Sequence, residues 1–549
     1  MMGMVVLMPP ALRKDEGKDA PVLQVEGAPR LPCSDWLRGR SSPLDRKGIG
    51  WLAARGQMMQ EDQIASESEK KLNQRAKEAV INRSFDPHHQ PDMSRKSSTP
   101  QAGPAKLDAG SEVMYVRSNR VVLDNTIGPA EIVISNGKIA EVLPKRNWAR
   151  PSGEKILDVG DLVVMPGIID PHVHICEPGH PSCEGFASVT KAAAAGGITT
   201  IVDMPVCLNL AKSYELIEGE IEQAELLPML KAGVPGFQCF LMATGVEDFS
   251  HVCLQDLHVA MNELQDTDCV LLFHAEQEPN QPMPVLEDTA EYSTFLDSRP
   301  DTMEVEATLT IAELCLQYKV PCHIINLSSA QALPIIKEAR HKGAPITVET
   351  THHYLSLSSE CIPPGGTYYK CCPPIREKSN QEQLWAALKV GLIDMVVSAH
   401  VPCFRNLKDG NNGDFLKAQA GIASLQFGLP LFWTSAKCRG FSFCDLVQLL
   451  CKNPAILSRL EDHKGSLSPG KDADLVIWDP EKEFEVKKDI IHHKCKVTPY
   501  LGFQLCGKVF ATLIRGRLVY LNGKFAPKAQ GELLVSERKM PTKILSPYY

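Results

Sequence analysis

The chain has no run of about 20 consecutive apolar residues, which is the length that a helix needs to cross a bilayer. It also has no excess of basic residues, because 58 Lys and Arg stand against 66 Asp and Glu, a formal net charge of −8. Since the two signs are interspersed, neither nucleic acid nor an anionic membrane surface is expected as a partner. A small molecule or another protein is the partner class that this balance favours.

Cysteine is too sparse for a disulfide scaffold, with 18 Cys among 549 residues. The apolar run from Met4 to Met8 is too short for the core of a signal peptide, and Pro9 and Pro10 end it. We therefore expect reduced thiols in an intracellular compartment. The cytosol is favoured, while Arg13 and Lys14 leave mitochondrial import open.

The apolar residues, 44% of the chain, are distributed unevenly. Residues 1–110 are rich in Pro, Ser, Gly, Arg and Lys and lack periodicity, so we expect a disordered extension there. Residues 111–165 and 465–535 show β-type alternation, with a turn signal at Asn136-Gly137. We expect these two flanks to pair into one small, discontinuous β-sandwich.

Between the flanks, residues 166–464 alternate short β-rich runs such as CVLLFHAE and ITVETTHHY with helical stretches. This alternation predicts a parallel sheet, and the number of units predicts a (β/α) barrel of the TIM type. Only 31 residues, 206–236, stand where the barrel needs a helix, its third strand and another helix. Because one unit takes about 30 residues, we expect the barrel to lack one βα unit. Residues 536–549 are expected to form a tail.

Three histidines stand at the ends of predicted barrel strands. His172 and His174 are two apart on the first strand, so their side chains face the same way and could chelate one metal ion. A lone His-x-His is weak evidence, but this one lies between MPGIID and EPG, where a barrel strand reaches its site-bearing carboxyl end. His274 ends the strand CVLLFHAE and should also face the barrel mouth. The alternative for His274 is an ordinary hydrogen-bonded histidine at a strand end.

A set of segments occurs in a highly specific order: MPGIIDPHVH, GGITTIVDMP, LLFHAE, HHYLSLS, KCCPPIRE, DMVVSAHVPC and GSLSPGKDADLVIWDP. Over residues 113–533 the chain resembles the cyclic amidohydrolases, and among them most closely the allantoinases. Dihydroorotase and dihydropyrimidinase share the framework, so the resemblance specifies the substrate less tightly than the fold. It implies an amidohydrolase-type barrel and, as the family reaction, hydrolysis of the hydantoin-ring amide of allantoin to allantoate in purine breakdown.

The resemblance also implies a metal chemistry. In the family, two zinc ions per subunit act as Lewis acids on a shared hydroxide. One metal takes the His-x-His pair, here His172 and His174, and a carbamylated Lys bridges both metals. The second metal takes a His from each of the fifth and sixth strands, and the fifth-strand ligand corresponds to His274. An Asp after the eighth strand binds the first metal and acts as the general base.

Three of these six positions depart from the family pattern. The bridging Lys position is Gln238, whose neutral carboxamide cannot react with carbon dioxide to form the anionic bridge. The sixth-strand His position is Asn326, a poor substitute for imidazole at a zinc site. The general-base position is Ala399, which can neither bind metal nor carry a proton. His323 should not replace the lost ligand because, three residues from Asn326 on a strand, it should point to the other face.

These departures leave three hypotheses. The first is an allantoinase homologue with impaired or lost catalysis and with weak or absent zinc binding. The second is a noncatalytic structural or interaction protein, like the dihydropyrimidinase-related proteins. The third is an active allantoinase, or a related dihydroorotase or dihydropyrimidinase. Allantoin is the small-molecule partner that the resemblance implies, and a homotetramer is the assembly common among relatives.

For the cysteines near the expected barrel mouth, the sequence predicts a place in the pocket and not a role as metal ligands. Cys372 is expected to line the substrate pocket, together with Cys371 and Cys403. Cys176 follows His174 by two residues and could extend the His-x-His motif into a zinc site. Because the chain is expected to turn before Cys176, a buried free thiol is the better interpretation.

Overall fold

The computed structural model describes residues 108–144, 155–175, 177, 184–204, 226–243, 251–279, 286–403, 407–408 and 412–534. All of these residues belong to one compact unit. Residues 1–107 of the extension expected over 1–110, the expected tail and Cys176 lie outside the described residues, whereas Gly110 donates a backbone hydrogen bond to Leu518.

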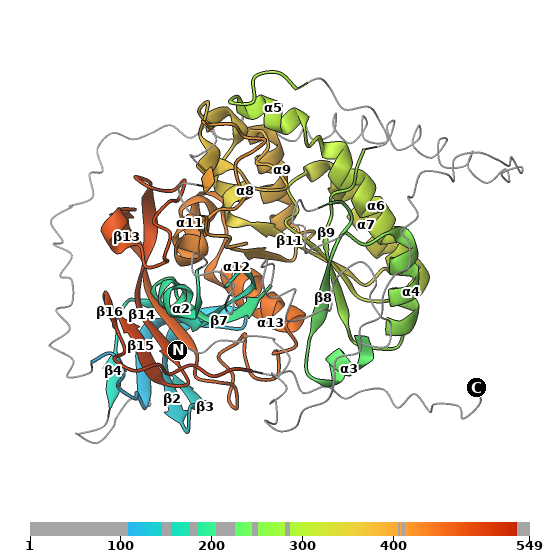
Figure 1. Cartoon of the computed structure of the whole chain (residues 1–549). Helices are drawn as coiled ribbons and strands as arrows, with labels where there is room; N and C mark the ends of the chain where they lie inside the picture. The colour runs from blue at the N-terminus through green and yellow to red at the C-terminus, as the bar shows by residue number, and fades with distance from the viewer. Residues whose placement is uncertain are drawn as a thin grey trace, which may run out of the picture. The chain divides into compact units, whose positions relative to one another are not determined.

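Strands from the two sequence flanks pair into one sheet of nine strands (Figure 1). These strands are β1 (Tyr115–Leu123), β2 (Thr126–Ser135), β3 (Lys138–Pro144), β4 (Ile156–Asp158), β5 (Val163–Pro166), β13 (Leu475–Glu485), β14 (Gln504–Ile514), β15 (Arg517–Leu521) and β16 (Lys524–Phe525). β5 joins the two flanks, because it pairs parallel with β1 and antiparallel with β13. Its neighbours enclose a hydrophobic core that contains both Ile132 and Leu475.

The turn predicted at Asn136-Gly137 connects β2 and β3. Asn136 has a φ of 51° and Gly137 a φ of 75°. Two successive residues with positive φ are what a tight hairpin turn of type I′ requires, and Asn-Gly is its preferred sequence. The sequence prediction of a hairpin at this position is therefore confirmed.

Seven further strands, all paired in parallel, belong to the central part of the chain. They are β6 (Ile168–Val173), β7 (Ile198–Asp203), β8 (Gly236–Phe240), β9 (Val270–His274), β10 (Cys322–Ile325), β11 (Ile346–Thr351) and β12 (Met395–Val397). β8 to β12 form one sheet in sequence order, and β6 pairs with β7. A parallel bridge between Val173 and His400 joins the end of β6 to the segment after β12.

One junction between neighbouring barrel strands remains, the one between β7 and β8. Among the described residues no strand stands between them and no pairing joins them, while residues 205–225 lie outside the described part of the chain. The absence of a third barrel unit therefore stays a prediction.

Helices cover the outside of the barrel strands, as α4, α6 and α7 do beside β8 and β9 in Figure 1. The α-helices are α2 (Phe186–Ala195), α3 (Leu226–Lys231), α4 (Leu254–Leu264), α5 (Tyr292–Asp297), α6 (Asp301–Tyr318), α7 (Leu333–His341), α8 (His352–Ser356), α9 (Lys378–Lys389), α11 (Gly428–Ala436), α12 (Phe443–Val447) and α13 (Asn453–Leu457). None of the described helices is long and apolar enough to cross a membrane.

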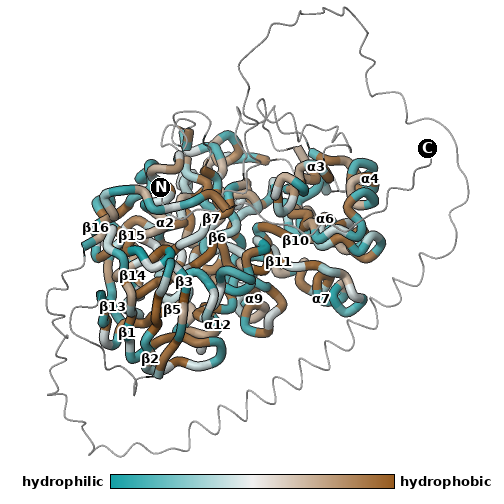
Figure 2. The backbone as a smooth tube through the Cα atoms, turned by 90° about the horizontal axis from the view of Figure 1, so that it is seen from below, coloured by the Kyte–Doolittle hydropathy of each residue, from teal (hydrophilic) through white to brown (hydrophobic). Residues whose placement is uncertain are grey.

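Barrel strands β6 and β7 are buried on both faces, as expected for a parallel sheet covered by helices. Every residue of β6 is buried, and so is every residue of β7 except Val202. Figure 2 shows hydrophobic stretches, in brown, along β5, β6 and β7. Polar side chains inside such strands, among them Glu349 of β11 and His323 of β10, must therefore find partners within the barrel.

Small residues let α2 lie directly against the flanking sheet. Thr512 of β14 donates a hydrogen bond of 2.6 Å from Oγ1 to the carbonyl oxygen of Ala194. Gly197, with a φ of 82°, is in a left-handed conformation that favours glycine. A β-carbon there would lie 2.4 Å from Cγ2 of Val476, so no larger residue fits without movement. This close contact holds the start of β7 against the sheet.

Candidate active site

The carboxyl end of β6 carries the two histidines of the His-x-His motif. Both rings are buried, and their centroids are 5.4 Å apart. Nδ1 of His172 lies 2.5 Å from Oε1 of Glu349, and Nδ1 of His174 lies 2.6 Å from the carbonyl oxygen of Met204. Burial lowers the pKa of His174 to about 3, so this ring is neutral at pH 7. Both acceptors take the proton of Nδ1, so Nε2 is the nitrogen that each ring would offer to a metal.

Glu349, on β11, holds two histidines from within the barrel. Its Oε2 lies 3.1 Å from Nε2 of His323, whose Nδ1 lies 2.7 Å from Oγ1 of Thr347. Burial would raise the pKa of Glu349, but His172 and His323 lower it to about 2, so the carboxylate is ionised. The expectation that His323 points away from the site is wrong. The expectation assumed that side chains alternate between the two faces all the way from His323 to Asn326. Asn326 lies beyond the end of β10 with a φ of 57°, so the alternation does not reach it.

Both nitrogens of His323 are engaged by these partners, so neither is left for a metal ion. His323 therefore offers no replacement for the sixth-strand ligand, as the sequence argument concluded for a different reason.

His274 ends β9, as predicted, and it pairs with a carboxylate. Its Nε2 lies 2.6 Å from Oε2 of Glu276, and the same oxygen accepts a hydrogen bond of 2.6 Å from Nη1 of Arg299. Burial opposes ionisation of Glu276, but Arg299 and His274 lower its pKa to about 2. The ring of Phe240 stacks on His274 with a centroid distance of 5.1 Å. Phe240 thus packs against one face of this imidazole and Glu276 bonds to its Nε2, so both contacts fix the orientation of the ring.

The three departing positions lie in or just after parallel barrel strands. Gln238 is half-buried on β8, in register with Leu272 of β9. Asn326 follows β10 directly, and its buried Oδ1 has no hydrogen-bond partner among the described residues. Ala399 lies two residues after β12, is buried, and has a φ of 43°.

The residues present do not fit a two-metal centre. The His-x-His pair offers two correctly oriented nitrogen donors, but catalytic zinc sites generally have three protein ligands. The second metal would have only His274 and an amide oxygen. Within the described ranges, no group of three or more His, Cys, Asp or Glu side chains is placed to hold a metal ion.

Cys372 is half-buried in the loop before Pro373. Burial raises the pKa of its thiol, and the neighbouring Arg299 opposes this shift, so the group is protonated at pH 7. Cys371 and Cys403 are buried. Cys372 thus lies close to the residues that orient His274, and its role in substrate binding stays a prediction.

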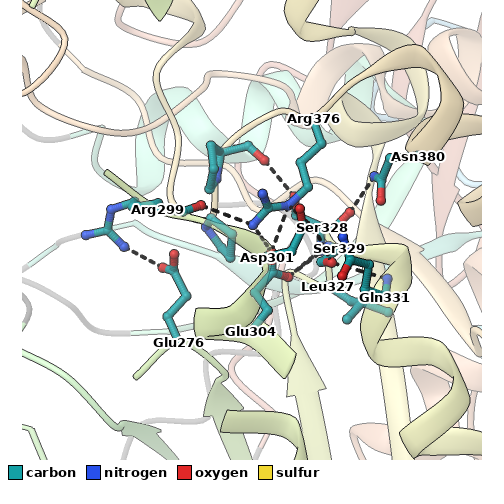
Figure 3. Close-up of polar contacts among 12 residues, drawn as sticks. Glu276, Arg299, Asp301, Glu304, Leu327, Ser328, Ser329, Gln331, Arg376 and Asn380 are labelled. Carbon is teal, nitrogen blue, oxygen red and sulfur yellow. Dashed lines mark hydrogen bonds and ion pairs between the residues drawn. The ribbon is translucent and has the colours of Figure 1, made fainter. Parts of the chain in front are cut away.

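Sequence analysis missed a buried polar network next to Asn326, drawn in Figure 3. Oε1 of Glu304 accepts a hydrogen bond of 2.7 Å from Nη2 of Arg376. Oε2 of Glu304 accepts the backbone N–H groups of Ser328, at 2.9 Å, and Ser329, at 3.0 Å. Nδ2 of Asn380 donates to the carbonyl oxygen of Ser328 at 2.8 Å. The network therefore fixes the loop that follows β10.

One sequence feature could have indicated this network, namely a charged residue on the apolar face of a predicted helix. Glu304 is almost fully buried on α6 although Glu is rarely buried unless paired. Its partner Arg376 follows the Pro-Pro pair of KCCPPIRE, 72 residues later. Nothing local in the sequence links the two positions.

Comparison with known proteins assigns the chain to a family. A family model described as the amidohydrolase family matches residues 163–519. The mitochondrial allantoinase of Aquarana catesbeiana is 53% identical over 414 residues, which cover 71% of this chain and 84% of that protein. The allantoinase of Saccharomyces cerevisiae is 37% identical over 466 residues, covering 77% of this chain and 99% of that protein. The chain is an allantoinase-like member of the amidohydrolase family.

Solved structures have the same fold as this allantoinase-like protein. The L-hydantoinase (dihydropyrimidinase) from Arthrobacter aurescens aligns with a TM-score of 0.67 and 26% identity, covering 78% of this chain and 98% of that one. A D-hydantoinase (dihydropyrimidinase) from Thermus sp. aligns with a TM-score of 0.68 and 24% identity, covering 77% and 99%, and supports the fold alone. The amidohydrolase-type α/β fold predicted from the sequence is confirmed.

Proposed function

We propose that this allantoinase-like protein is impaired in the hydrolysis of allantoin and related cyclic amides because it does not assemble a two-metal centre. One observation carries the proposal: β8 and the segments after β10 and β12 carry Gln238, Asn326 and Ala399. The family resemblance implies a carbamylated Lys, a His and an Asp there. Two of those groups are anions, and two dications a few ångströms apart repel each other strongly unless anionic ligands lie between them.

The proton balance of the reaction supports the same proposal. Opening a cyclic amide requires a group that takes a proton from the attacking water and a group that delivers one to the leaving nitrogen. The methyl group of Ala399 does neither, and the two His-x-His nitrogens bonded to Glu349 and Met204 are already committed as donors.

The proposal is tested by measuring allantoin ring opening with the purified full chain in the presence of added zinc. We expect no rate above the uncatalysed reaction for the parent chain or for Gln238→Lys, Asn326→His or Ala399→Asp alone. The reason is that ligands and base act as a unit, so each is useless without the others. We expect the triple reversion to hydrolyse allantoin only in a chain that also has the third barrel unit.

The control for this assay is His172→Ala, which removes a donor that the parent chain keeps. Zinc-dependent turnover by the parent that His172→Ala abolishes would show that the replaced groups are dispensable and would overturn the proposal.

A second candidate function is an active allantoinase. The observations that favour it are the 53% identity to the allantoinase of Aquarana catesbeiana and the metal-binding form of His172 and His174. The same assay separates the two candidates, because this one requires turnover by the unmodified chain.

A further inference from the structure

Two buried thiols meet at the connection between α6 and β10. Cys315, on α6, and Cys322, the first residue of β10, are both fully buried. Each Sγ lies 3.4 Å from the same acceptor, the carbonyl oxygen of Val320. The two side chains also form a hydrogen bond with each other, which lowers the pKa of Cys315 and raises that of Cys322. The pair is thus a contact between two thiols.

The connection between the two cysteines is short and reaches the surface. α6 ends at Tyr318, and Lys319, with a φ of 58°, is exposed and turns the chain toward β10. Neither sulfur atom is exposed, so a small solute would reach the pair only through a local opening of this turn.

The thiol pair lies at the opposite end of the α6–β10 unit from the network of Figure 3. Glu304, in the first turn of α6, holds the backbone of Ser328 and Ser329 after β10. Cys315 and Cys322 lie where the helix ends and the strand begins. A bond between the two sulfur atoms would therefore tie the helix to the strand at the end that lacks the polar network.

We propose that Cys315 and Cys322 form a redox modification site, in which a hydroperoxide converts the two thiols into a disulfide that joins α6 to β10. The Cys315 thiolate attacks the terminal oxygen of the hydroperoxide, and the O–O bond breaks to give a sulfenic acid. With hydrogen peroxide, the displaced hydroxide takes up a proton as water. The Cys322 sulfur then attacks the sulfenic sulfur, the S–O bond breaks, and a second water leaves. Two thiols and one hydrogen peroxide become one disulfide and two waters.

Contact, and not burial alone, distinguishes this pair from other thiols of the chain. Cys451 is also fully buried, and its Sγ lies 3.4 Å from the carbonyl oxygen of Pro166. The only residue that shifts its pKa besides burial is Lys452. Cys451 therefore matches Cys315 in burial and in bonding to a carbonyl oxygen, but no other thiol in the described part of the chain shares its acceptor.

The test uses the folded full chain. The exposed thiols Cys253, Cys361 and Cys438 are first blocked with N-ethylmaleimide, and the chain is then treated with hydrogen peroxide. Trypsin and the protease Glu-C together cleave after Lys319 and Glu313, which places Cys315 and Cys322 on different peptides that contain no other cysteine. Mass spectrometry without reduction is expected to find these peptides joined, with two hydrogens fewer than their sum, and dithiothreitol is expected to separate them.

Stability gives an independent readout. Oxidation is expected to raise the melting temperature by about 2–4 °C, because the disulfide restricts the unfolded chain. Cys315→Ser should lose both the joined peptides and this shift, whereas Cys451→Ser should keep both. Recovery of the two peptides unjoined after peroxide treatment, or of Cys322 joined to Cys239 or Cys269 instead, overturns the proposal. The peptide result is obtained on the unsubstituted chain, so it stands even if a variant fails to fold.

Discussion

Ala399 has a φ of 43°, a left-handed conformation in which a β-carbon crowds the backbone. Its neighbours hold it there, because Ser398 N–H donates to Asp170 at 3.2 Å and His400 N–H donates to the carbonyl oxygen of His172 at 3.4 Å. Asp and Asn tolerate this conformation better than other residues with a β-carbon. The backbone thus keeps a conformation suited to the Asp that the resemblance implies, while the side chain that would use it is gone.

We expect Ala399→Gly to raise the free energy of unfolding by about 0.5–1 kcal/mol, because glycine adopts positive φ without the steric cost. Chemical denaturation measured by circular dichroism checks this value. The matched control is Ala386→Gly on the exposed side of α9, where the same change should lower stability by about 1 kcal/mol. A loss of stability at both positions would show that Ala399 is not strained.

At the scale of elements, α6 and β10 depend on a buried ion pair. The Arg376 guanidinium is 3% exposed and pairs with Glu304 at 2.7 Å, while Asp301 lies 3.1 Å from its Nε. Glu304 also holds two backbone N–H groups of the loop after β10. Removing the charge of Glu304 leaves Arg376 buried with weaker compensation, a change that is usually costly.

We expect Glu304→Gln to lower the free energy of unfolding by about 3 kcal/mol and to increase hydrogen exchange at Ser328 and Ser329. The control is Glu338→Gln, which breaks the exposed pair with Lys342 on α7 and should change stability by less than about 0.5 kcal/mol. Equal effects of the two substitutions would contradict the structural role of the network.

The strands and their ends could be predicted from the sequence because each is a short buried run with its own pattern. His172, His174 and His274 lie at such ends, and local alternation was enough to place them. The partners of these histidines could not be predicted. Glu349 is 177 residues from His172, and only the arrangement of β6, β11 and β12 in space brings them together.

The error over His323 has a physical cause of the same kind. Strand alternation holds only while the chain remains extended, and Asn326 leaves the strand with a φ of 57°. No sequence signal marked this change, because Asn is common both in turns and at strand ends. The resemblance identified Asn326 as a ligand position, but only the structure shows the backbone conformation of this residue.

At the scale of the whole unit, the barrel strands and the flanking sheet hold the strand ends at one place even though the ligand set has changed. Val173 and His400 connect the first and last barrel strands, and α2 packs against β14 through Ala194 and Thr512. This framework does not depend on any of Gln238, Asn326 or Ala399. It follows that the fold would persist in a chain that binds metal weakly, as proposed above.

Metal content tests the central claim most directly, because it does not depend on the choice of substrate. Elemental analysis of the purified full chain after exposure to zinc and dialysis is expected to find well under one zinc per subunit, since two neutral imidazoles hold zinc weakly without a third protein ligand. The Gln238→Lys, Asn326→His and Ala399→Asp triple variant is expected to retain more zinc than the parent. Two tightly held zinc ions per subunit in the parent chain would contradict the account.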